Sequence, residues 1–80
     1  MDDETVIRDI NDLAREEHEL FERESRGAAS ADDRERLRRL QIMLDQCWDL
    51  LRQRRARREF GQDPDEARLR DEKTVESYSG

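Results

Sequence analysis

Apolar side chains recur every three or four residues near the start of the chain, at Val6, Ile10, Leu13 and, beyond a polar Glu17, at Leu20. This spacing is typical of a helix with one apolar face and differs from the alternation of a half-buried strand. The acidic run at residues 2–4 suits a helix cap and first turn, where carboxylates face the positive end of the helix dipole. The pattern therefore predicts a helix over residues 3–25.

A second periodic stretch predicts a helix over residues 31–60. Eight apolar positions fall within an arc of about 160° at ~100° per residue, and they are Leu37, Leu40, Met43, Leu44, Cys47, Trp48, Leu50 and Leu51. A two-stranded coiled-coil seam needs a narrower stripe. One short partner helix would leave part of this face uncovered, so a second hairpin is its expected cover.

The residues between and after these stretches predict how the helices are joined. Gly27 suits a helix C-cap, and Ser30 followed by Asp33 resembles a capping box. A short loop makes consecutive helices antiparallel neighbours. Gly61 can end the second helix, and Asp63-Pro64 suits the start of a third over about residues 64–70. We expect a frayed tail at 71–80, with Val75 and Tyr78 as its only anchors.

These elements predict an all-α fold. A coiled-coil-like antiparallel helical hairpin fills residues 1–62, and a short helix and flexible tail fill 63–80. The chain has 80 residues, 32% of them apolar and 48% charged, with one cysteine. Domains this small are usually stabilised by disulfides, a metal ion or a partner subunit. The sequence offers neither an internal disulfide nor a set of metal ligands, so we expect self-association to stabilise the small core. We expect a homodimer with four helices in a bundle. Its expected core or interface residues are Ile7, Ile10, Leu13, Phe21, Leu37, Leu40, Met43, Leu44, Cys47, Trp48, Leu50 and Leu51.

Charge is distributed unevenly along the chain. Residues 1–30 carry net −6, residues 31–60 net +3 and residues 61–80 net −3, which gives −6 in total. Five arginines lie in seven residues, at Arg52, Arg54, Arg55, Arg57 and Arg58. These side chains could bind phosphate, contact a protein partner, or pair with the carboxylates at the start of the first helix. A dedicated nucleic-acid binder normally shows a basic excess over the whole domain, which favours pairing.

Candidate chemistry is sparse. A Glu-x-x-His metal motif around His18, the only histidine, would need a glutamate where Arg15 stands. No phosphate loop, catalytic triad or Cys-x-x-Cys pair is present, so we expect no enzyme, cofactor or metal. We interpret Cys47 as a small buried apolar side chain in a protein of a reducing compartment. The acidic N-terminus and the lack of a long apolar run predict a cytoplasmic protein without a membrane span.

The stretch from Leu44 to Arg58 (LDQCWDLLRQRRARR), followed by Gly61 and the run Asp63–Ala67 (DPDEA), resembles a family of short actinobacterial proteins that form a domain of unknown function. The resemblance also takes in residues 16–18 and 75–78. It implies a cytosolic bacterial protein and supplies no catalytic or binding residues. The expected function is a protein-interaction or assembly module. A nucleic-acid- or ribosome-associated factor that uses the arginine cluster is the alternative.

Overall fold

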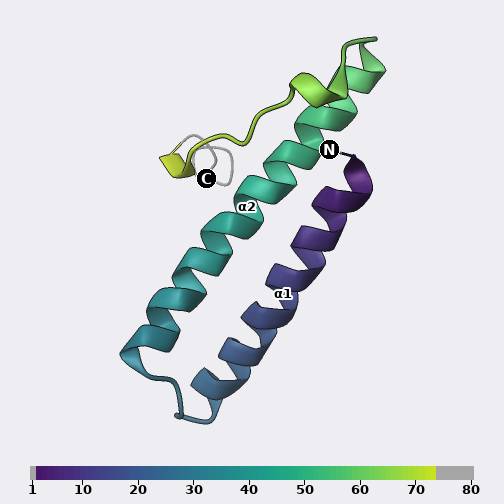
Figure 1. The fold of residues 1–80 in the computed structure, drawn as a ribbon. Coiled ribbons are helices and arrows are strands. Elements are labelled where there is room, and N and C mark those ends of the chain that lie inside the picture. The colour runs from purple at the N-terminus through teal and green to yellow at the C-terminus, as the bar shows by residue number, and fades with distance from the viewer. Residues whose placement is uncertain (1, 74–80) are drawn as a thin grey trace.

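Two long helices packed side by side make up most of the computed structural model, which describes residues 2–73 (Figure 1). Helix α1 spans Asp3–Ser25 and helix α2 spans Ala31–Glu59. They run antiparallel, and a 3-10 turn, η1, follows at Pro64–Glu66. The all-α hairpin is confirmed, and both helices lie within one residue of their predicted bounds.

Local capping fixes where each helix begins. The Asp2 carboxylate accepts hydrogen bonds from the Thr5 backbone N–H and the Thr5 hydroxyl, both at 2.8 Å. At the start of α2, Ser30 Oγ accepts from the Asp33 N–H at 3.0 Å, while the Asp33 carboxylate accepts from the Ser30 N–H at 3.1 Å. This reciprocal pair is a capping box.

Both helices end at a glycine with a left-handed backbone. Gly27 has φ +71° and Gly61 has φ +70°. After α1, the Ala28 N–H donates to the Arg23 carbonyl and the Gly27 N–H to the Glu24 carbonyl. The same pattern closes α2. These are Schellman motifs, which satisfy the last carbonyls and turn the chain out of the helix axis.

The core is one layer of apolar side chains between the helices, divided into two clusters. Leu20, Leu37 and Leu40 form the cluster nearer the loop. The other, nearer the termini, consists of Val6, Ile10, Leu44, Leu50, Leu51 and Ala67. Leu13 packs against both clusters and joins them. Ala67 lies beyond the hairpin, so the C-terminal part of the chain contributes to this core.

The predicted third helix over residues 64–70 is wrong. Its start is as expected, because Asp63 caps the turn and Pro64 takes the first helical position. The turn then stops after three residues, and Ala67 adopts an extended backbone with φ −62° and ψ 143°. Residues 68–71 continue without helical structure. The expected anchors Val75 and Tyr78 lie outside the described residues.

Candidate functional site

The extended chain after η1, residues 67–70 (here the C-terminal segment), is fastened to α2 by a buried carboxylate. The Asp49 side chain is only 3% exposed. It accepts two hydrogen bonds from the Arg70 guanidinium, from Nε and from one terminal nitrogen, both at 2.8 Å. Gln53 donates a third, at 2.9 Å. A carboxylate removed from water costs free energy unless it is paired and hydrogen-bonded in this way.

Two glutamines on the same side of α2 bind the main chain of the C-terminal segment. Gln46 donates its side-chain N–H to the Arg70 carbonyl at 3.2 Å, and Gln53 donates to the Arg68 carbonyl at 2.7 Å. In a helix over 64–70 these two carbonyls would lie in the last turn and have no intrahelical partner. The glutamines satisfy them, and together with Asp49 they hold the extended segment along α2.

The arginines of the cluster differ in burial and in the ion pairs that they form within residues 2–73. Arg54 is buried, with 6% of its side chain exposed. Its guanidinium donates to Asp3 at 2.7 Å, to Asp65 at 3.1 Å and to the Pro64 carbonyl at 3.2 Å. The hydrogen bond from Arg54 holds the pKa of Asp3 below its ordinary value. Arg54 therefore ties the start of α1, the end of α2 and η1 together.

The other four arginines are more accessible. Arg58 also pairs with Asp3, and Arg57 pairs with Glu66 at 3.5 Å. Arg52 and Arg55 are exposed and enter no ion pair among residues 2–73. Of the carboxylates expected to receive this cluster, the structure brings Asp3 to it, and it adds Asp65 and Glu66 from η1.

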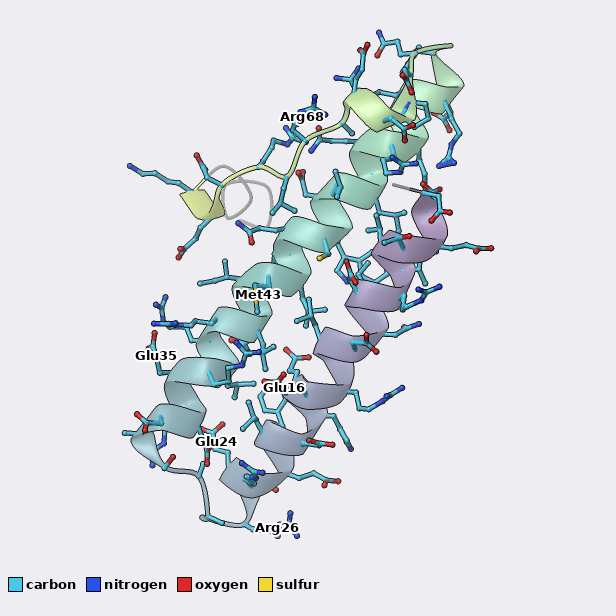
Figure 2. All side chains as sticks on the ribbon, in the orientation of Figure 1. Glu16, Glu24, Arg26, Glu35, Met43 and Arg68 are labelled. Atoms are coloured by element: carbon cyan, nitrogen blue, oxygen red, sulfur yellow. The ribbon has the colours of Figure 1, made fainter. Side chains whose placement is uncertain are left out.

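A groove runs between the helices beside the C-terminal segment. A pocket of about 330 Å³ is lined by Asp9, Asp12 and Leu13 of α1, by Met43, Gln46 and Cys47 of α2, and by Leu69. Figure 2 labels Met43 on α2 and Glu16 on α1, whose carboxylate pairs with Arg36 at 2.6 Å. Burial raises the pKa of the Cys47 thiol, which disfavours the reactive thiolate.

Three large apolar side chains within α1 and α2 are exposed. Ile7 is 40% exposed, Phe21 44% and Trp48 49%. Ile7, Ala14 and Phe21 follow one another at intervals of seven residues, which is about two helical turns. They therefore lie on one side of α1, and Ala14 is exposed as well. We call the surface formed by Ile7, Ala14, Phe21 and Trp48 the open face.

The predicted core or interface residues therefore fall into three groups. Six are buried: Ile10, Leu37, Leu40, Leu44, Leu50 and Leu51. Leu13, Met43 and Cys47 are half-buried at the groove, and Ile7, Phe21 and Trp48 are exposed. The wide apolar face of α2 is thus covered on one edge by the chain's own C-terminal segment.

The buried Asp49 and the two glutamines were missed as contact residues. On a charged helix such side chains resemble solvent-facing ones. The only available signal was their spacing, because positions 46, 49 and 53 share one side of a helix.

The remaining candidate chemistry stays isolated. His18 contacts Glu22 at 3.2 Å, and both side chains are largely exposed. Within the described part of the chain, no three His, Cys, Asp or Glu side chains gather where a metal ion would bind. None of the helices described is long and apolar enough to cross a membrane.

Fold and site together define a small all-α hairpin whose C-terminal segment is bound to its longer helix. The chain belongs to the family DUF2630, "Protein of unknown function", whose model matches residues 2–80. It is 47% identical over 79 residues to uncharacterized proteins of Mycobacterium tuberculosis and Mycobacterium bovis, an overlap that covers 98% of this chain and 91% of each relative. The resemblance to an actinobacterial family of unknown function is confirmed. No solved structure matches the chain.

Proposed function

We propose that the protein is a small cytoplasmic protein-interaction and assembly module that self-associates through the open face and has no catalytic role. The observation that carries the proposal is the exposure of Ile7, Phe21 and Trp48 on a hairpin only one layer thick. Aromatic side chains, tryptophan above all, supply much of the binding free energy at protein interfaces. A partner that covered them would remove apolar surface from water, which favours association.

The test is sedimentation equilibrium over a hundredfold dilution, at low and at high salt. We expect a dimer for the wild-type chain. Trp48→Gln should weaken association at least tenfold while the far-UV circular dichroism stays unchanged, because the side chain is already half exposed in the single chain. Phe60→Gln is the matched control, since Phe60 is 77% exposed just beyond α2 and away from the open face. A folded wild-type monomer at every concentration would contradict the proposal.

A second candidate function is binding to single-stranded nucleic acid, and one observation favours it. Trp48, Arg52 and Arg55 are exposed at spacings of four and three residues, so an aromatic ring lies beside two arginines that have no ion-pair partner among the described residues. Bases stack on aromatic side chains, and arginines neutralise phosphates. The net charge of −6 opposes this function.

Fluorescence anisotropy with a labelled single-stranded RNA would test it. Binding should weaken steeply with salt and disappear when Arg52 and Arg55 are both replaced by glutamine. Affinity that is independent of salt, or unaffected by that double substitution, would exclude the nucleic-acid role.

A further inference from the structure

Helical geometry places the exposed apolar side chains of α1 on the same side of the hairpin as Trp48 of α2. Asp9 and Asp12 of α1 line one pocket with Met43 and Gln46 of α2, which fixes one broad face of the molecule. At ~100° per residue, Ile7 lies about 140–160° around α1 from the two aspartates. Trp48 lies a similar angle around α2 from Met43 and Gln46. Ile7 and Trp48 therefore share the opposite face.

The ion pairs between the helices set which residues lie at the same height along the hairpin. Asp3 pairs with Arg54, Glu16 with Arg36, and Arg23 with Asp33. Because the helices are antiparallel, the numbers of residues at equal height have a nearly constant sum, about 55 on average over these pairs, which puts Ile7 level with Trp48 near the termini. By the same count, Ala14 is level with Gln41 at the middle and Phe21 with Arg34 near the loop.

The helices carry opposite charge. Helix α1 contains nine acidic and three basic residues, net −6, whereas α2 contains six acidic and nine basic residues, net +3. Two chains packed with α1 on α1 would oppose acidic helices to each other. Packing α1 on the partner's α2 pairs opposite charges, and opposite potentials across an interface favour one orientation over another.

The same arrangement brings particular charges together. On the rim of α1, Glu4 and Glu22 lie about 60° around the helix from Ile7. At matching heights, Glu4 would approach the level of Arg52 and Glu22 that of Arg34. The broad face is also large enough to form a dimer interface. The molecule measures 49 × 25 × 16 Å, and a stable dimer buries about 800 Å² on each partner.

We infer that a second copy of this chain covers the open face, with α1 of each chain resting on α2 of the other. This inference rests on the proposed self-association and specifies its geometry. The twofold axis runs parallel to the helices, and every helix of the resulting four-helix bundle is antiparallel to its two neighbours. Ile7 of one chain then faces Trp48 of the other, and Ala14 faces Gln41.

Disulfide trapping distinguishes this arrangement from one in which like helices pack together. A disulfide requires Cα atoms about 4.4–6.8 Å apart. In a Cys47→Ala background, Ala14→Cys and Gln41→Cys are made as separate chains, of which one carries a mass tag. Both positions are exposed, so the substitutions should leave the hairpin folded. Mild oxidation of the mixture should give mainly the mixed disulfide between the two chains, and Ala14→Cys alone should stay largely reduced. Glu19→Cys, on the groove side of α1, is the control that should join to neither chain.

The experiments distinguish a wrong dimer geometry from an absence of self-association. If Ala14→Cys joins efficiently to itself and the mixed disulfide is rare, α1 packs on α1, and the inferred geometry is wrong although self-association stands. If sedimentation finds a dimer and neither disulfide forms above the Glu19→Cys background, another face is used and the inference fails. If the wild-type chain is monomeric, the proposed function fails as well. A folding defect from Cys47→Ala would show in circular dichroism, and Cys47→Ser is the second background.

Discussion

The carboxylate of Asp49 and the guanidinium of Arg70 face each other in a two-pronged contact, with both nitrogen–oxygen distances at 2.8 Å. Twenty-one residues separate them in sequence. The pair holds the C-terminal segment against α2, and removal of either side chain leaves its partner's hydrogen bonds incomplete.

Replacing Arg70 should release this segment. Arg70→Ala leaves the buried carboxylate with Gln53 as its remaining side-chain donor, which should lower the free energy of unfolding by about 1–3 kcal/mol. Backbone amides of residues 67–70 should also exchange hydrogen faster. Urea denaturation and hydrogen exchange measure the two effects. Arg68→Ala is the control, because within residues 2–73 the Arg68 side chain donates to the nearby Asp65 and Ala67 carbonyls and not to Asp49. Equal losses for both variants would show that Asp49 does not hold the segment.

Two adjacent arginines should respond very differently to the same substitution. Arg54→Gln removes a buried cation from Asp3 and Asp65, so we expect a loss of about 2–4 kcal/mol in unfolding free energy. Arg55→Gln changes an exposed side chain and should stay within about 0.5 kcal/mol of wild type. Thermal or urea unfolding of both variants gives the comparison. Similar values would mean that the Arg54 contacts contribute little.

The glycine that ends α2 should resist a side chain for backbone reasons alone. A Cβ on Gly61 would meet no atom within 4 Å, yet its φ of +70° is unfavourable for most residues. Gly61→Ala should therefore cost about 1–2 kcal/mol. Gly61→Asn should cost less, because asparagine tolerates the left-handed region. Equilibrium unfolding of the two variants tests this order, and alanine equal to asparagine would argue against it.

The chain should lose stability in acid through carboxylates whose pKa is lowered in the fold. The hydrogen bond from Arg54 lowers the pKa of Asp3, and the one from Arg36 lowers the pKa of Glu16. A group with a lowered pKa contributes its stability above its ordinary value, about 4, and loses it as pH falls through the lowered value. Melting temperatures from pH 7 to pH 2 should thus fall below about pH 4. Asp3→Asn should start lower and decline less steeply, whereas a parallel decline would remove Asp3 from this account.

The hairpin could be predicted from sequence because its determinants are local. Asp2, Ser30 and Asp33 act on amides three residues away, and each glycine acts at the helix end where it lies. The apolar period of α1 and α2 adds a signal that needs no knowledge of the partner helix. Together these features placed four helix ends to within one residue.

The C-terminal segment could not be predicted, because the interactions that shape it are not local. Asp63 and Pro64 correctly indicate a helical start, and nothing nearby in sequence shows that the turn stops at Glu66. Gln46, Asp49 and Gln53 bind the extended segment from 15 to 24 residues away in sequence. Sequence patterns likewise placed Trp48 on an apolar arc without showing which edge of that arc the chain itself covers.

The glutamine contacts bear on how this protein can vary between species. Gln46 and Gln53 bind the carbonyl oxygens of residues 70 and 68, which every amino acid supplies, so the Gln53 contact does not depend on the side chain at position 68. The contacts do depend on the number of residues in the C-terminal segment, since one inserted residue would move position 70 by about 3.3 Å along an extended chain and past Asp49. Among natural variants, the residue type at position 68 should therefore vary more than the length of the C-terminal segment.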